Sequence, residues 1–197
     1  MTKRLTCVYL IMGLVLLASC ASTKVVEHWT DTDFDAKLKN IMVLSLNQSD
    51  KSRRLFEDGF LTALKQRNIR SLVSYDLLSS NEDLNKEKVK AAIAGSDIDG
   101  VLVLRSVKIT KEESYQQPTA TSRRDNFYAY VGRYGPSSGA STVEDTIVHL
   151  ESNLYAVAGE QLIWTGKTES FNPADVGTLL IEMSERILDA IGRTGFI

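Results

Sequence analysis

Short apolar runs that alternate with amphipathic segments constrain the fold of this chain more than any other feature of its sequence. The run 40–46 (NIMVLSL) and the run 101–104 (VLVL) are apolar at nearly every position. A strand with one face in water would alternate apolar and polar residues, so these continuous runs predict strands that are covered on both faces.

The segments between these two runs predict two helices and one more strand. Ser49 or Asp50 can cap a helix that ends near Asn68. Its apolar stripe comprises Leu55, Phe56, Phe60, Leu61, Ala63 and Leu64. Residues 71–75 predict a second strand and residues 85–94 a second helix. Strand, helix, strand, helix, strand in this order indicates crossover connections over a parallel sheet.

The following part of the chain predicts antiparallel strands. Val107 and Ile109 alternate with polar residues, so the third strand is expected to run beyond the helix-covered part of the sheet. The segments 146–157 and 161–169 alternate in the same way, and a tight turn at 158–160 joins them.

The chain is expected to end in a helix. Asn172 is the expected cap, with Pro173 at the first helical position and Gly192 at the end. Its apolar stripe consists of Val176, Leu180, Met183, Ile187 and Ile191.

These patterns predict an α/β (α+β) fold, with a mixed sheet of about five strands, the element order β-α-β-α-β-β-β-α, and helices packed on the sheet. Neither a repeat nor a second core is evident, so one periplasmic domain is expected over residues 36–197. Residues 20–35 are mostly polar and are interpreted as a tether that can dock partly on the domain.

The first 19 residues have the order of a secretory signal peptide. Lys3 and Arg4 precede an apolar run over residues 8–17, and Ala18 and Ser19 provide the small residues of a cleavage site. The run is shorter than the ~20 residues that a spanning helix needs.

Residues 17–20 (LASC) resemble the lipobox of bacterial lipoproteins. The resemblance implies lipid on Cys20 and cleavage before it. The absence of aspartate at the next position, which is Ala21, favours the outer membrane over the inner one. Several acyl chains make such an attachment effectively permanent. The alternative is an ordinary signal peptide with a chance cysteine.

Cysteine content excludes a fold held by internal disulfides, and net charge excludes a nucleic-acid-binding protein. The only other cysteine, Cys7, lies in the signal peptide, so the mature chain has no internal disulfide. Loss of Lys3 and Arg4 changes the net charge from −2 to −4, with 21 basic against 25 acidic residues left. Nucleic-acid binding is excluded, because it needs clustered positive charge.

Several local sequences along the chain together resemble a group of small bacterial lipoproteins. They are Trp29 with 31–34, 54–57 (RLFE), 74–75 (SY), 99–103 (DGVLV), 154–155 (LY) and 162–164 (LIW). The layout is similar to the periplasmic α/β domains of the curli secretion lipoprotein and to the amino-terminal domain of the Tol-system propeller protein. The resemblance implies a fold and supplies no catalytic residue.

Motifs for catalysis and metal binding are incomplete. Residues 135–139 (GPSSG) fit G-x-S-x-G, but the strand before and the helix after it are missing. The alternating aspartates at 31, 33 and 35 begin like an EF-hand loop, yet positions six and twelve hold Ala36 and Met42. His28 and His149 are too few for a zinc site. We therefore expect no enzyme, metal or cofactor.

The segment 115–141 is the strongest candidate for a binding surface. Its aromatic residues are Tyr115, Phe127, Tyr128, Tyr130 and Tyr134, interspersed with Arg, Gly and Ser. This composition is typical of recognition surfaces. The alternative, held equally open, is that the rings fold back over the domain's own sheet.

Two functional hypotheses follow. The first is a non-enzymatic accessory, assembly or binding factor of the outer membrane, with a protein or envelope polymer as its partner. The second is a hydrolytic or small-ligand-binding lipoprotein with a cleft. A deep pocket lined by converging carboxylates or His149 would favour the second hypothesis, and a flat aromatic patch the first.

Overall fold

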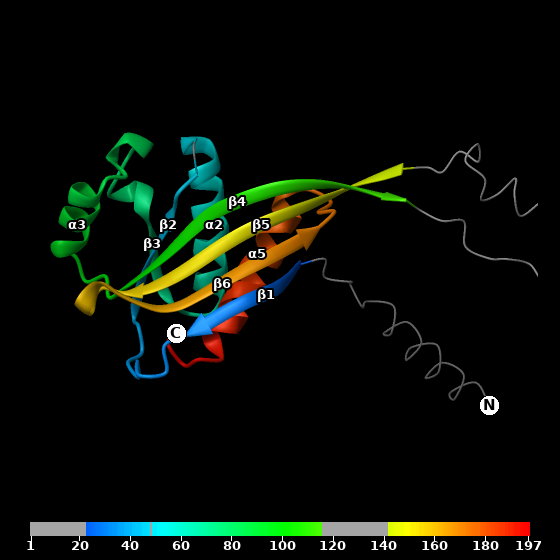
Figure 1. Cartoon of the computed structure of the whole chain (residues 1–197). Coiled ribbons are helices and arrows are strands. Elements are labelled where there is room, and N and C mark those ends of the chain that lie inside the picture. Colours follow the sequence, from blue (N-terminus) through cyan, green and yellow to red (C-terminus); the bar gives the residue numbers. More distant parts are fainter. Residues whose placement is uncertain (1–22, 48, 116–141) are drawn as a thin grey trace, which may run out of the picture.

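The computed structural model contains one mixed sheet with helices packed on it (Figure 1), and it describes residues 23–47, 49–115 and 142–197. Over these residues the sheet has six strands in the order β1-β6-β5-β4-β2-β3. The strands are β1 (Thr23–Thr30), β2 (Asn40–Ser45), β3 (Arg70–Val73), β4 (Gly100–Tyr115), β5 (Thr142–Ala156) and β6 (Gln161–Phe171). The helices are α2 (Asp50–Gln66), α3 (Lys86–Ala94) and α5 (Val176–Gly192). The predicted fold class is confirmed.

The first half of the sheet is parallel, as predicted. Strand β2 lies between β3 and β4, and Ile41 is in register with Ser71 on one side and Gly100 on the other. Every residue of β2 is buried, because helices cover both faces of this strand. The uniformly apolar run in the sequence reflects this position.

The helices divide between the two faces of the sheet. Ile41 and Val43 point into the main core, to which α2 contributes Phe60 and Leu64 and to which α5 also contributes side chains. Met42 and Leu44 point the other way, into a smaller core that α3 closes. Successive residues of a strand face opposite sides, so β2 supplies both cores.

The second half of the sheet is antiparallel. Strand β5 pairs with β4 on one side and with β6 on the other. Strand β6 ends at Phe171, opposite Ile147, whereas β4 and β5 stay paired as far as Tyr115 and Thr142. The two long strands therefore leave the sheet as a two-stranded ribbon (Figure 1).

The sixth strand is the main difference from the expected layout. Residues 23–30, which we expected in the tether, form β1 and pair antiparallel with β6. At the edge of the sheet most side chains of β1 are exposed, including Trp29. The segment therefore lacks the apolar alternation of a half-buried strand, and the main-chain pairing gave no signal in the sequence.

The helix boundaries confirm one expected cap and correct another. Ser49 caps α2 by accepting a hydrogen bond from the backbone N–H of Ser52, and Asn68 beyond its end has a φ of 59°. Helix α5, however, is capped by Asp175 and not by Asn172. Asn172 has a φ of 44°, and its side chain accepts a hydrogen bond from the backbone N–H of Thr146, so it closes the turn before the helix.

Candidate functional site

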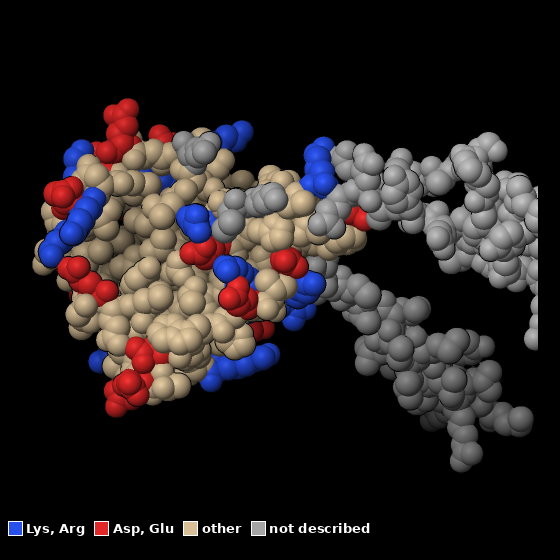
Figure 2. Space-filling model, viewed as in Figure 1, with Lys and Arg blue, Asp and Glu red and all other residues tan. Residues whose placement is uncertain are grey.

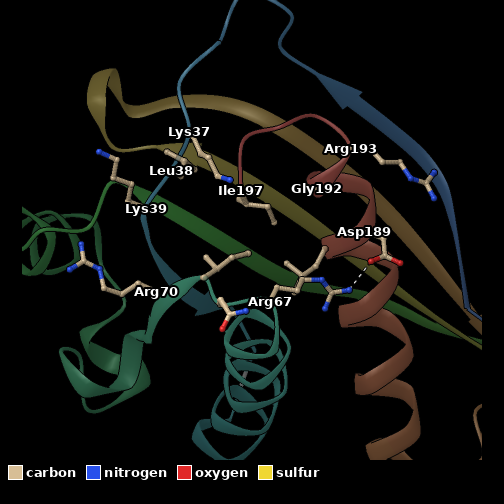
Figure 3. A pocket seen from close by; sticks show the side chains of 12 residues that line it. Lys37, Leu38, Lys39, Arg67, Arg70, Asp189, Gly192, Arg193 and Ile197 are labelled. Carbon is tan, nitrogen blue, oxygen red and sulfur yellow. Dashed lines mark hydrogen bonds and ion pairs between the residues drawn. The ribbon is translucent and has the colours of Figure 1, made fainter.

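An open pocket lies where α2 and α5 end (Figure 3). Its volume is about 700 Å³, within the range of ligand-binding pockets. Twelve residues line it: Lys37, Leu38, Lys39, Arg67, Asn68, Ile69, Arg70, Leu188, Asp189, Gly192, Arg193 and Ile197. They come from the segment before β2, the turn between α2 and β3, and the end of the chain.

The ionisable side chains of this pocket are mostly cationic. Five are Lys or Arg and one is a carboxylate. Asp189 accepts a hydrogen bond from Arg67 Nη2 at 2.7 Å, and Arg70 pairs with Asp97 at 2.9 Å. Within the described ranges, Lys37, Lys39 and Arg193 make no salt bridge. These three exposed cations are available to an anionic ligand.

Helix capping accounts for only part of this charge. Arg67 and Arg193 are the C-cap residues of α2 and α5, where positive charge offsets the helix dipole. Lys37 and Lys39 belong to neither helix and precede β2. Figure 3 shows the side chains of Lys39 and Arg193 on opposite sides of the pocket, so the cations surround it and do not meet at one point.

Apolar side chains line the pocket between the charges. Leu38 and Leu188 are buried in the main core, and Ile69 and Ile197 are partly buried against it. The segment before β2 is held in place because the Leu38 N–H donates to the Phe196 carbonyl at 2.8 Å. The pocket thus combines an aliphatic floor with a cationic rim.

The positive surface continues into a second hollow between β1 and α5. Its volume is about 600 Å³, and it shares Asp189 and Arg193 with the first pocket. Lys24, His28 and Arg186 add basic side chains to its lining.

The uncovered face of the antiparallel strands has a different charge pattern (Figure 2). Arg105, Glu151, Lys167 and Glu27 follow one another in register across β4, β5, β6 and β1. Arg105 pairs with Glu151, and Lys167 pairs with Glu27 at 2.7 Å. Because the signs alternate, this face does not concentrate one kind of charge.

The site residues named from the sequence fall mostly outside the described residues. Cys20, Phe127, Tyr128, Tyr130 and Tyr134 lie outside them, and Tyr115 is the last residue of β4. Lipidation of Cys20 and binding by the aromatic segment therefore stay predictions.

The two histidines and the alternating aspartates do not form a metal site in the described parts of the chain. His149 lies 3.6 Å from Glu169 and 3.4 Å from Thr110 Oγ1. Asp31 accepts hydrogen bonds from the Asp33 N–H and from the Gln161 side chain. Among these residues there is no group of three or more His, Cys, Asp or Glu placed to hold a metal ion.

No helix within the described ranges is long and apolar enough to span a bilayer.

The sequence matches no protein-family model and no curated protein. Solved structures similar to this one include the PelC dodecamer from Paraburkholderia phytofirmans, with a TM-score of 0.46 and 12% identity over 83% of this chain and 96% of that chain. Lipoprotein GNA1162 from Neisseria meningitidis has a TM-score of 0.43 and 12% identity over 78% and 98% of the two chains. A minor lipoprotein from Acinetobacter baumannii has a TM-score of 0.34 and 8% identity over 78% and 91%. The likeness concerns the fold alone.

Proposed function

We propose that this chain is a lipid-anchored lipoprotein of the outer membrane that acts as a non-enzymatic binding factor. Its basic pocket holds an acidic segment of a partner protein. The observation that carries the proposal is an open pocket of about 700 Å³ in a net acidic chain, lined by Lys37, Lys39 and Arg193, whose side chains make no salt bridge within the described residues.

The shape of the pocket supports a peptide segment over a small anion. Five cations line an open surface, and aliphatic side chains lie between them. An extended acidic segment can place carboxylates on the cations and methylene groups on the aliphatic floor. Arginine is well suited to such contacts because its planar guanidinium binds a carboxylate through two hydrogen bonds.

The same pocket gives less support to a hydrolytic function. Its one acidic side chain, Asp189, is already bonded to Arg67, and paired carboxylates or a carboxylate with histidine would be needed for acid–base work. His149 does not line it. The outer-membrane location rests on the residues around Cys20, and likeness to the curli and Tol proteins stays a prediction from the sequence.

Charge reversal in the pocket tests the proposal. We expect a ten-residue glutamate peptide to bind the protein, as measured by calorimetry, and to bind Lys37→Glu/Lys39→Glu at least about tenfold more weakly, since two contacts to charge are lost. The matched control Lys51→Glu/Lys86→Glu has the same net charge but lies on exposed positions of α2 and α3. An equal loss of affinity for the peptide in both double variants would show a nonspecific charge effect. Displacement of the peptide by millimolar inorganic phosphate would indicate a small-anion site instead.

A further inference from the structure

The folded domain begins very close to the proposed lipid. Only two residues separate Cys20 from Thr23, the first residue of β1. An extended chain spans at most about 3.6 Å per residue, so Thr23 lies within about 11 Å of Cys20. If Cys20 is lipidated, the surface around Thr23 is held at the membrane in any orientation of the domain.

Hydrogen bonds identify which elements share this end of the molecule. Thr23 Oγ1 bonds to Ser170 Oγ at 2.9 Å and to Glu182 Oε2 at 2.8 Å. Strand β6 ends one residue after Ser170, and α5 begins a few residues later. Figure 1 shows β1 beginning and β6 ending at the same end of the sheet.

Three of the nine large apolar side chains that are exposed in the described parts of the chain lie on β6 and the first turns of α5. Phe171 is 47% exposed, Val176 51% and Ile181 60%. Val176 and Ile181 are five positions apart on α5 and point about 140° apart, so the three residues share this end of the molecule without forming one face. We call them the anchor-end patch. Asp175 is the one charged residue between 171 and 181, and its carboxylate is occupied in capping α5 through the N–H and hydroxyl of Thr178.

The C-terminal end of α5 is surrounded by cationic side chains. The helix runs 17 residues from Val176 to Gly192, about 26 Å at 1.5 Å per residue, and ends at the basic pocket. The end of α5 near Thr23 therefore carries exposed apolar side chains beside the Lys24–Glu169 ion pair, whereas its other end is lined mainly by cations.

We infer that the anchor-end patch rests in the interfacial layer of the bilayer that carries Cys20. This inference rests on the proposed lipidation. Apolar side chains at the surface of a helix enter the boundary between headgroups and acyl chains when the helix is held there. Seating of the patch would orient α5 so that the basic pocket faces away from the bilayer.

A fluorescent probe on the patch tests this orientation. The mature chain has no thiol other than Cys20, so an environment-sensitive dye can be placed on Ile181→Cys without a competing site. Lys65→Cys, exposed in the last turn of α2 near the basic pocket, is the control. The lipidated full-length proteins are reconstituted in phosphatidylcholine vesicles that contain brominated lipid.

We expect strong quenching of the Ile181 probe and at least about threefold less quenching of the Lys65 probe. Lipid on Cys20 is measured by mass spectrometry on the same samples. Equal, weak quenching in samples with lipidated Cys20 would overturn the inference and leave the anchor intact. Absence of the lipid would remove the basis of both proposals. If the soluble Cys20→Ser protein forms dimers in which the probe at position 181 is shielded from water, a second copy of the chain covers the patch. That result would also overturn the inference.

Discussion

Glu57 and Arg53 form an ion pair one turn apart in α2, with Arg53 Nε 3.0 Å from Glu57 Oε1. The side chain of Glu57 is 0% exposed and that of Arg53 is 1% exposed. Glu57 also accepts hydrogen bonds from the backbone N–H of Ser45, from the Ser74 hydroxyl at 2.6 Å and from the backbone N–H of Tyr75. The pair thereby joins α2 to the ends of β2 and β3.

Removal of one charge from this pair should destabilise the fold. Glu57→Gln leaves the Arg53 guanidinium buried without a counter-charge, and breaking a buried pair in this way costs about 3–5 kcal/mol. Thermal and urea unfolding measure the effect. Glu185→Gln, exposed on α5, is the control and should change the free energy of unfolding by less than about 0.5 kcal/mol. Similar changes in the free energy of unfolding for both variants would contradict the assigned role of the pair.

Two neighbouring residues of α5 should respond very differently to truncation. Leu180 is 4% exposed and faces Gly59 of α2, whereas Ile181 is 60% exposed. Leu180→Ala should lower the free energy of unfolding of the unlipidated protein by about 2–5 kcal/mol. Ile181→Ala should change it by less than about 0.5 kcal/mol. A large effect of Ile181→Ala would show that this side chain is packed inside the domain.

Gly166 leaves room for the ring of Trp164. A Cβ at this position would lie 2.3 Å from Cη2 of the buried indole. Gly166→Ala should therefore destabilise the domain by at least about 1–3 kcal/mol and change the tryptophan fluorescence. Gly95→Ala adds its Cβ where no atom lies within 4 Å and provides the control. An unaltered melting temperature in Gly166→Ala would contradict this packing.

In the folded protein Tyr75 should lose its hydroxyl proton at a higher pH than an ordinary tyrosine. Its hydroxyl donates a hydrogen bond to Asp58 at 2.6 Å, and this bond raises the pKa of Tyr75 from 10.0 to about 12. Arg54, whose guanidinium lies 4.3 Å from the ring centre, opposes the shift.

The neutral phenol is favoured by folding, so its contribution to stability is complete below pH 10 and is lost as the pH rises through about 12. The difference in tyrosinate absorbance between the wild type and Tyr75→Phe isolates this group, and Asp58→Asn should move its midpoint towards 10. A wild-type midpoint near 10 would contradict the shift.

Much of the fold could be predicted because its signals are local. The apolar run 40–46, of which residues 40–45 are buried, and the four-residue spacing of Phe56, Phe60 and Leu64 each report the surroundings of one element. Strand β1 could not be predicted, because an edge strand is defined by its main-chain partner and its side chains remain in water. The start of α5 was placed too early, so Val176 was wrongly assigned to the buried stripe and is exposed.

The candidate pocket depends on contacts that no local pattern reports. Lys37, Arg67 and Arg193 come from distant parts of the chain and meet only because α2 and α5 end on the same side of the sheet. The Arg53–Glu57 pair has the spacing of an exposed salt bridge. Its burial follows from the turn at Ser74–Asp76 (η2), which covers it.

The most direct test of this account is the mass of the amino-terminal peptide of the protein isolated from its own membranes. We expect a chain that begins at Cys20 and carries acyl chains on that residue, recovered with the outer membrane after a high-salt wash. Cys20→Ser should be missing from that fraction. An unmodified Cys20, or mature Cys20→Ser that still fractionates with the outer membrane, would contradict the lipid anchor on which both proposals depend.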